Sequence, residues 1–375
     1  MTKKIIWGIV IVVAILLIAG FLANINTPEG KTIKIGAIFP LTGKEASVGE
    51  SQKNGMDLAV TEINKTGGIN GQPIKVIYED SVSETAKAVS AYQKLTRIDG
   101  ATAIFTSLSG VTLGIAPIAE KDKVLNLNIG GAAATISSVG DYTFRHSALP
   151  QDESKALATF VYNNMKVKEV AMLVVKTESG ISASNEFRKF YETLGGKISI
   201  SESYEKGATD YKTLLLKIKA LKTKNIATIS YAAEMGIQFK QAKELDMDVQ
   251  WFTAFTAEDP QTIVSGGEAA NGVIYTHYYD ANSTDLNFTQ YKNSYRTAYK
   301  ADPGPYSALS YDFINILASA MRQCQNPYDS TCVKNELYKI QNYSGVTGKI
   351  SFDSNGDTNK GLIIKTIKNG EFVKY

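Results

Sequence analysis

The sequence predicts an α/β protein with two doubly wound parallel-sheet lobes, preceded by one N-terminal transmembrane helix. Three observations predict it. The length of 375 residues suits two domains of average size. Strand-type and helix-type hydrophobic patterns alternate along most of the chain. An uncharged apolar run occupies Ile5–Ala23. Hydrophobic residues make up 44% and charged residues 21%, which indicates neither a disordered chain nor a polytopic membrane protein.

The N-terminal segment predicts a membrane anchor. Lys3 and Lys4 precede the run Ile5–Ala23, which is long enough to cross a bilayer core, and the positive-inside tendency places everything after it outside the cytoplasm. A candidate cleavage site at Phe21-Leu22-Ala23 lacks the small outer residue of a signal peptide, and Phe21 stands where a lipidated cysteine would be needed. We expect an uncleaved anchor followed by a short tether, with a cleaved signal as the alternative.

The first lobe begins with a β-rich run at Ile33–Phe39 that stops at Pro40, followed by apolar residues at helical spacing as far as Asn64. Repeated βα units of this kind predict a parallel sheet covered on both faces. The next elements are expected as a strand at Ile74–Glu79, a helix at Thr85–Ile98, a strand at Ala103–Phe105, a helix at Val111–Lys121 and a strand at Val124–Leu127.

A second series of the same kind begins after Pro150 and predicts the second lobe. Its helices are expected at Ser154–Met165, Ala183–Leu194, Tyr211–Leu221 and Gly236–Glu244, and its strands at Val170–Val175, Ile198–Tyr204, Ile226–Tyr231, Trp251–Ala254 and Val273–Tyr278. A long helix at Tyr306–Arg322 and a strand-rich tail follow.

The two cysteines, Cys324 and Cys332, flank a polar, turn-rich stretch. Outside the cytoplasm a close pair of this kind usually oxidises, so we expect a disulfide, with two separate thiols as the alternative. Neither His146 nor His277 lies near the pair in sequence, so the sequence predicts no zinc site.

The charge and the motif content argue against two function classes. The formal net charge is only +3 and no stripe of lysine and arginine is apparent, so no nucleic-acid partner is expected. No G-x-S-x-G elbow, phosphate-binding loop or G-x-G-x-x-G after the first strand is present. We therefore expect neither an enzyme nor a bound cofactor.

Three motifs carry a resemblance to a known family. The segments GAIFPLTG at 36–43, INKTGGING at 63–71 and GVTGKISFDSNGD at 345–357 resemble the leucine/isoleucine/valine-type periplasmic substrate-binding proteins of ABC importers. The resemblance runs from about Ile33 to Tyr375. It implies a two-lobed clamp whose chain crosses between the lobes near Pro150, Tyr278 and Thr347.

The resemblance also implies a domain division and a function. Residues 1–30 would be the anchor and tether, 31–149 plus 279–347 the first lobe, and 150–278 plus 348–375 the second. The protein would capture a small polar molecule (an amino acid, amide or carboxylate) outside the cytoplasm and deliver it to the permease of an ABC importer. The alternative is a ligand-sensing receptor subunit of the same fold that signals through a membrane partner.

Candidate ligand contacts in the first lobe follow two predicted strands, because doubly wound sheets bind ligands beyond the carboxyl ends of their strands. Ser109 precedes a helix, where its hydroxyl would either cap the helix or hold a ligand carboxylate, as the family resemblance implies. Gly130, Gly131 and Ala132 let a ligand approach the backbone. The family's threonine aligns with Ala132 unless a gap moves Thr135 into its place.

Candidate contacts in the second lobe include departures from the family. Tyr231 matches a family tyrosine that faces the ligand. Two family aromatic residues become Val48 and Ser179, and the acid that pairs with the ligand ammonium aligns with Phe255. We therefore expect weaker selection for an α-amino group. Glu258, three residues further on, is expected to be an exposed loop acid, with a role as substitute for the family's acid as the alternative.

Some remaining residues mark the lobe junctions. Arg145 and His146 approach the first crossover, where bracing of the junction is expected rather than ligand contact. The tyrosines at 275, 278 and 279 mark the second crossover and would either line the cleft or pack at the hinge.

Overall fold

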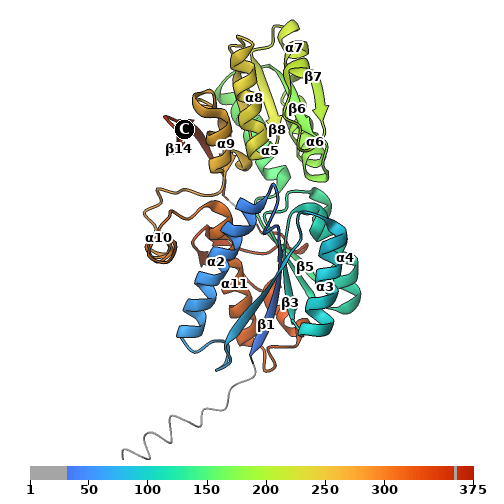
Figure 1. Ribbon diagram of the computed structural model, residues 1–375, viewed down its shortest axis with the longest axis vertical. Coiled ribbons are helices and arrows are strands. Elements are labelled where there is room, and N and C mark those ends of the chain that lie inside the picture. Colours follow the sequence, from blue (N-terminus) through green and yellow to red (C-terminus); the bar gives the residue numbers. More distant parts are fainter. Residues whose placement is uncertain (1–31, 359–360) are drawn as a thin grey trace, which may run out of the picture.

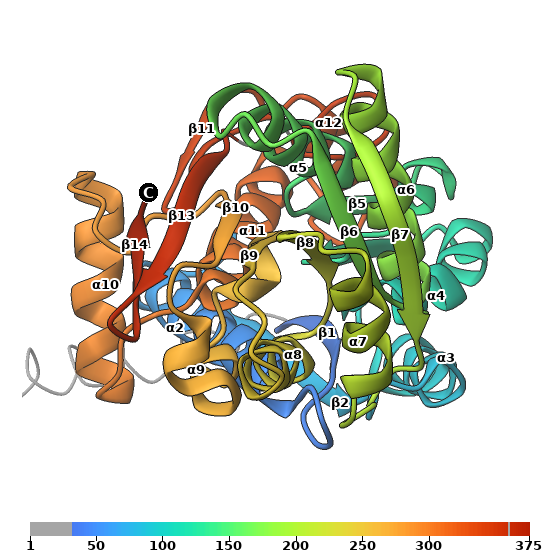
Figure 2. The same ribbon diagram turned by 90° about the horizontal axis from the view of Figure 1, so that it is seen from above.

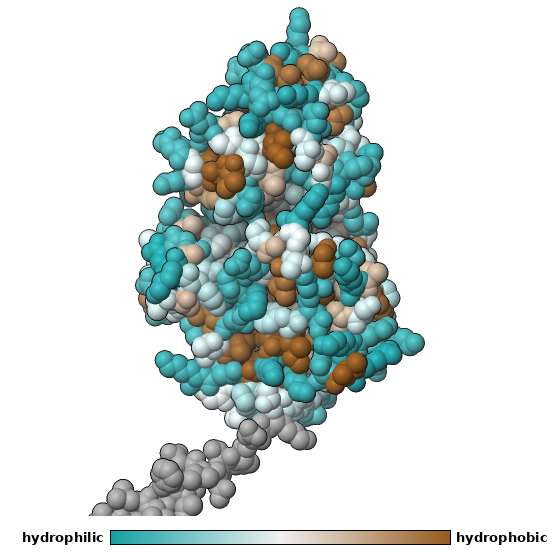
Figure 3. Space-filling model, viewed as in Figure 1, coloured by the Kyte–Doolittle hydropathy of each residue, from teal (hydrophilic) through white to brown (hydrophobic). Residues whose placement is uncertain are grey.

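The structure is a computed structural model that describes residues 32–358 and 361–375, and it has two lobes stacked along the long axis of the molecule (Figure 1). The expected transmembrane helix at Ile5–Ala23 and its tether lie outside the described residues. Among the helices that are described, none is both long and apolar enough to cross a bilayer. On the face shown in Figure 3, hydrophobic residues lie in small groups among hydrophilic ones.

The first lobe is built on a five-stranded parallel sheet in the order β2-β1-β3-β4-β5. Its strands are β1 (Ile33–Phe39), β2 (Ile74–Asp80), β3 (Ala103–Ser107), β4 (Leu125–Ile129) and β5 (Thr143–His146). One face packs against α2 (Ala46–Lys65) and α11 (Pro305–Gln323), and the other against α3 (Thr85–Lys94) and α4 (Ser109–Asp122) (Figure 1). The sheet is thus covered on both faces, as a parallel sheet requires.

Helices α2 and α11 approach each other closely at Gly55. A Cβ atom at this position would lie 2.0 Å from the carbonyl oxygen of Ser307 on α11. The absence of a side chain therefore permits the crossing, and any larger residue at Gly55 would push the two helices apart.

The second lobe is built on a seven-stranded sheet in the order β14-β13-β10-β9-β8-β6-β7, and Figure 2 shows the strands in this order. Its strands are β6 (Glu169–Val175), β7 (Lys197–Tyr204), β8 (Asn225–Ile229), β9 (Gln250–Thr253), β10 (Ile274–His277), β13 (Ile363–Lys368) and β14 (Glu371–Lys374). The strands from β7 to β10 are parallel, whereas β13 and β14 form an antiparallel hairpin on β10. The expected all-parallel second sheet is therefore only partly correct.

Helices cover both faces of the second sheet. They are α5 (Pro150–Thr159), α6 (Glu178–Thr193), α7 (Lys212–Ala220), α8 (Ala232–Glu244) and α9 (Pro260–Gly266). Residues of α5 and α6 contribute to the hydrophobic core on one face, and residues of α7 and α8 to the core on the other. The predicted βα alternation of this lobe is confirmed.

Three elements of the first lobe were not predicted from the sequence: β5, α10 (Leu286–Tyr299) and α12 (Ser330–Tyr338). Strand β5 carries Arg145 and His146, which argue for a surface segment, yet all four of its residues are buried. Helix α10 buries a stripe of aromatic residues, Phe288, Tyr291 and Tyr295, and Asp285 caps its N-terminus. Polar or aromatic residues concealed the burial pattern in both segments.

The last passage between the lobes lies between Thr358 and Ile363, later than the expected position near Thr347. Strand β12 (Gly348–Ile350) pairs with β11 (Tyr343–Gly345), and Ile350 and Phe352 join the hydrophobic core of the first lobe. Residues 348–358 thus pack with the first lobe before the chain enters β13.

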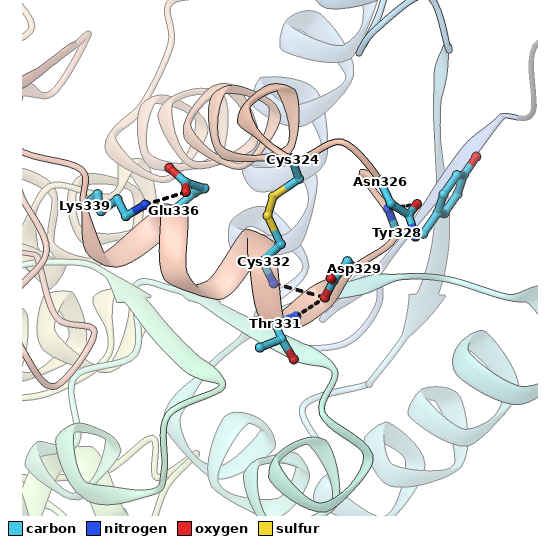
Figure 4. Close-up of a disulfide and its surroundings, with 8 residues drawn as sticks. All are labelled: Cys324, Asn326, Tyr328, Asp329, Thr331, Cys332, Glu336 and Lys339. Carbon is cyan, nitrogen blue, oxygen red and sulfur yellow. Dashed lines mark hydrogen bonds and ion pairs between the residues drawn. A yellow bond between two sulfur atoms is a disulfide. The ribbon is translucent and has the colours of Figure 1, made fainter.

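A disulfide joins Cys324, just after α11, to Cys332 in the first turn of α12, with the two Cα atoms 6.1 Å apart (Figure 4). The Asp329 carboxylate caps α12 by accepting hydrogen bonds from the N–H groups of Thr331 and Cys332. The predicted disulfide is confirmed.

Replacing both cysteines by serine is expected to lower the free energy of unfolding by about 2–3 kcal/mol, because the short closed loop restricts the unfolded chain. Urea denaturation of oxidised wild type and of the Cys324→Ser/Cys332→Ser variant measures this difference. Reducing agent should produce a similar loss in wild type and none in the variant. Equal stability of the two oxidised proteins would contradict the prediction.

Candidate functional site

A cavity of about 60 Å³ lies where the two lobes meet, at the carboxyl ends of β6, β8 and β9. Parallel strands end at the same edge of a sheet, so the loops after them converge here. The second lobe supplies almost all of the lining, including Glu153, Ser179, Tyr231 and Phe255. Ala132, from the loop after β4, closes the cavity from the first lobe.

Ser109 holds the loop that carries Ala132. Its Oγ atom accepts hydrogen bonds from the N–H groups of Ala132 and Ala133, each with a donor–acceptor distance of 3.0 Å. The Ser109 side chain does not cap α4, because the helix begins at Ser109 itself and Leu108 occupies the capping position. The simple capping role is therefore wrong. With two donors at the oxygen, the hydroxyl hydrogen remains to be donated, although Ser109 lies behind the cavity wall and not on it.

The two glycines before Ala132 shape this loop and do not line the cavity. Gly130 has a φ of 79°, and a Cβ atom there would lie 2.9 Å from the ring of Tyr306. The Gly131 N–H donates to the Asn128 side chain at 2.8 Å. Thr135 is exposed in the short 3₁₀ helix at Ala134–Ser138, so the structure does not bring it into the cavity.

Three residues predicted in the second lobe, Ser179, Tyr231 and Phe255, line the cavity together. The Tyr231 ring lies beneath the Lys206 ammonium, which is 4.4 Å from the ring centroid. Phe255 is 3% exposed, and its ring centroid lies 6.0 Å from that of Tyr306 on α11. Val48 is buried in α2 and does not line the cavity.

The two lobes touch each other across the site. The Ala134 N–H of the first lobe donates to Ser182 Oγ of α6 at 3.0 Å. The Lys206 ammonium of the second lobe lies 3.3 Å from the Glu45 carboxylate of the first. Together with the Phe255–Tyr306 contact, these interactions indicate a closed arrangement of the lobes.

Glu258 is not the exposed loop acid expected from the sequence. It is 5% exposed, lies 2.5 Å from the Lys365 ammonium and accepts a hydrogen bond from the Tyr275 hydroxyl at 2.9 Å. Burial raises its pKa, and Lys365 and the Tyr275 hydroxyl partly oppose that rise. Glu258 does not line the cavity, so its role is structural.

Arg145 braces the same loop as Ser109. Its guanidinium donates to Asp357 at 2.6 Å, to the Ala133 carbonyl oxygen at 2.9 Å and to Ser137 Oγ at 2.7 Å. The side chain is fully buried and does not line the cavity. Arg145 thus braces the loop after β4 against the segment at Asp357 within the first lobe.

The three tyrosines near the second crossover are buried in the hydrophobic cores, Tyr278 and Tyr279 in that of the first lobe and Tyr275 in that of the second. The Tyr275 hydroxyl is bound to Glu258, the Tyr279 hydroxyl donates to the Pro303 carbonyl oxygen at 2.8 Å, and Tyr278 packs against Phe255. None of them lines the cavity.

Glu153 is a cavity residue that was not predicted from the sequence. It lies in the first turn of α5 and is 4% exposed. Within the described part of the chain, its Oε1 atom has no hydrogen-bond partner, and neither has Oγ1 of Thr253, which lines the same cavity. Burial raises the pKa of Glu153 well above 4.5, while a hydrogen bond from the Phe255 backbone and the charge of Arg145 oppose the rise. In the sequence, Asp152-Glu153 after a proline indicates only a helix start.

The described residues include no group of three or more histidine, cysteine, aspartate or glutamate side chains that could hold a metal ion. The cavity instead combines an apolar wall, formed in part by Leu157, Phe187 and Phe255, with a few polar groups. This composition is typical of small-molecule binding sites.

Two α/β lobes that close over a cavity at their strand ends define a bilobal solute-binding protein. The model of the family described as "Periplasmic binding protein" matches residues 32–371. The chain therefore belongs to this family, as its motifs predicted.

Among its curated relatives is the leucine-, isoleucine-, valine-, threonine- and alanine-binding protein of Pseudomonas aeruginosa, 24% identical over 96% of this chain and 94% of the relative. A similar solved structure is the branched-chain amino acid transporter substrate-binding protein LivJ of Streptococcus pneumoniae in complex with isoleucine (27% identity, TM-score 0.85, 91% of this chain and 98% of that one).

Another is the solute-binding protein of an ABC transporter from Rhodopseudomonas palustris in complex with 3,4-dihydroxybenzoic acid (22% identity, TM-score 0.83, 92% of this chain and 95% of that one). At this identity the likeness shows the shared fold alone.

Proposed function

We propose that the protein captures a small carboxylate with an apolar body in the cavity beneath Ala132 and delivers it to the permease of an ABC importer. The position of the cavity is the main support for this proposal, because it lies between two lobes that contact each other around it. Relatives of the same fold and length are named for binding amino acids or hold an aromatic acid.

The two sides of the site suit such a ligand. On the first lobe, Ser109 holds the Ala132 loop that closes the cavity, and the N-terminus of α4, which begins at Ser109, favours a negative charge on that side. On the second lobe, Leu157, Phe187 and Ile229 offer an apolar surface to the rest of the molecule. A carboxylate held at the Ala132 side of the cavity would direct its apolar body toward that surface.

We also propose that the protein works outside the cytoplasm, tethered by Ile5–Ala23. The Cys324–Cys332 disulfide supports an oxidising compartment, and the apolar segment is long enough to span a bilayer. The full-length protein should then remain with the membrane fraction after high-salt washing. A soluble form that begins between Gly20 and Thr27 would show cleavage instead.

A thermal-shift screen on protein refolded from denaturant, which removes carried-over ligand, tests the proposed function. The panel should include apolar amino acids, their 2-oxo acids and benzoates. A true ligand at a hundredfold excess over its Kd stabilises the folded state by about 2.7 kcal/mol. No shift with any compound would contradict the proposal.

A variant that fills the cavity provides the control. Ala132→Leu places a bulky side chain at the cavity wall and should abolish the shift, whereas Ala86→Leu, on the exposed face of α3, should leave it unchanged. If Ala132→Leu still responded fully, the ligand would bind somewhere else.

A further inference from the structure

Glu153 is a buried carboxyl group that faces the cavity without a cationic partner in the described structure. Its side chain is 4% exposed, it lines the cavity, and its Oε1 atom has no hydrogen-bond partner among the described residues. An unpaired carboxylate in such a place is unfavourable, since its desolvation is not offset by a cation. An unpartnered polar atom on a residue that lines a cavity points to a group on the ligand.

The cation whose charge acts on Glu153, Arg145, already has hydrogen-bond partners of its own. Arg145 donates to Asp357, to the Ala133 carbonyl oxygen and to Ser137, and no hydrogen bond joins it to Glu153 in the described structure. Its charge reaches Glu153 only as a longer-range effect that lowers the pKa. Glu153 therefore has no hydrogen-bonded cation among the described residues, and a cationic group of the ligand can take that place.

Other acids near the cleft do not face this cavity. Glu258 is paired with Lys365. Glu45, Glu234 and Asp259 line a neighbouring pocket between the lobes, and Glu45 is paired with Lys206. Of the acidic residues in the described structure, Glu153 alone is among those that line the cavity beneath Ala132.

We propose that the Glu153 carboxylate binds the ammonium group of the ligand, so that the protein selects an apolar α-amino acid over the same carboxylate without nitrogen. This inference rests on the proposed function and names its substrate class. Thr253 Oγ1, buried and without a partner among the described residues, provides a second acceptor in the same cavity. An ammonium group has three donors, which these two oxygens can share.

This assignment reverses the expectation drawn from Phe255. An aromatic residue at the position of the family's acid predicted weak selection for an α-amino group. The structure brings an acid to the cavity from another element, the first turn of α5, whose N-terminal dipole also favours a carboxylate. Phe255 and Glu153 therefore line the same cavity from different elements of the second lobe, the short 3₁₀ helix after β9 and the first turn of α5.

Isothermal titration calorimetry on matched pairs tests the assignment. Leucine, valine and phenylalanine are each compared with their own 2-oxo acid, using refolded wild type, Glu153→Gln and Asp152→Asn. Wild type should bind at least one amino acid at least about tenfold more tightly than its 2-oxo acid, a difference of about 1.4 kcal/mol. Glu153→Gln should lose that preference and keep its affinity for the 2-oxo acid.

The matched control is Asp152→Asn, which removes a neighbouring carboxylate outside the cavity lining and should keep the preference. Binding of the 2-oxo acid by Glu153→Gln shows that the variant folds. If it does not fold, Glu153→Asp, which withdraws the carboxylate by one methylene, should weaken amino-acid binding selectively.

The outcomes separate the two proposals. Equal affinity of wild type for both members of every pair, or an unchanged preference in the Glu153 variant, would overturn the assignment alone. Binding of benzoate without any amino acid would do the same and leave the proposed function standing. No binding of any carboxylate would refute the proposed function and the assignment with it.

Discussion

Replacing Arg145 by methionine is expected to lower the free energy of unfolding by about 3–5 kcal/mol, because it leaves a buried charge without its partner. Arg145 is fully buried and Asp357 is 2% exposed, with 2.6 Å between Nε and Oδ1. The substitution also removes the donors to the Ala133 carbonyl oxygen and Ser137. The loop that carries Ala132 would then lose one of its two braces, so ligand affinity should fall as well.

Urea denaturation measures this loss, and Arg296→Met is the matched control. Arg296 pairs with Asp302 on the surface, where the two side chains are 51% and 60% exposed. Exposed pairs of this kind contribute about 0–1 kcal/mol. A loss for Arg145→Met as small as that of the control would show that the buried pair does not brace the junction.

Replacing Lys365 by methionine is expected to be comparably destabilising, by about 3–5 kcal/mol near neutral pH. Lys365 and Glu258 are 1% and 4% exposed, so the carboxylate would remain buried without its cation. The pair joins β13 to the segment after β9, and its loss would loosen this part of the second lobe. Adding Glu258→Gln to Lys365→Met should recover part of the stability, since the uncompensated charge is then absent.

The loss in Lys365→Met should depend on pH. Burial already raises the pKa of Glu258 above 4.5, and removal of Lys365 takes away the largest opposing effect. A carboxyl group whose pKa is higher in the folded than in the unfolded chain binds more protons when folded. Its contribution to stability is therefore greatest below its unfolded pKa and is lost as the pH rises through the folded pKa.

Lys365→Met should thus be less destabilised at about pH 5 than at about pH 8, relative to wild type at the same pH. Denaturation midpoints at the two values test this. A loss that is independent of pH would show that Glu258 does not carry the uncompensated charge.

The fold was predictable because its signals are local and repeated. Strands such as β1 and β6 are apolar along most of their length, and the helices between them carry one apolar face. Strand β5 was missed because Arg145 is buried through a partner, Asp357, that lies 212 positions further along the chain. Only the tertiary fold brings this pair together. The same contact keeps the segment around Asp357 packed on the first lobe, so the chain enters the second lobe later than expected.

The site was predictable where residues follow strands directly. Ser179, Tyr231 and Phe255 come after β6, β8 and β9, and they meet in one cavity. Glu153 was not predictable, since a carboxylate in the first turn of a helix usually faces solvent. Its burial depends on how α5 packs across the second sheet. Glu258 was misjudged for the same reason, because its partner Lys365 lies 107 positions away.

The proposed function requires that a ligand is captured between two lobes that close around it. Small-angle X-ray scattering on refolded protein, with and without a ligand identified in the screen, tests this most directly. The ligand-saturated protein should match the closed arrangement described here, and the ligand-free protein should have a larger radius of gyration. An identical radius of gyration in both states, with binding confirmed by calorimetry, would contradict the account.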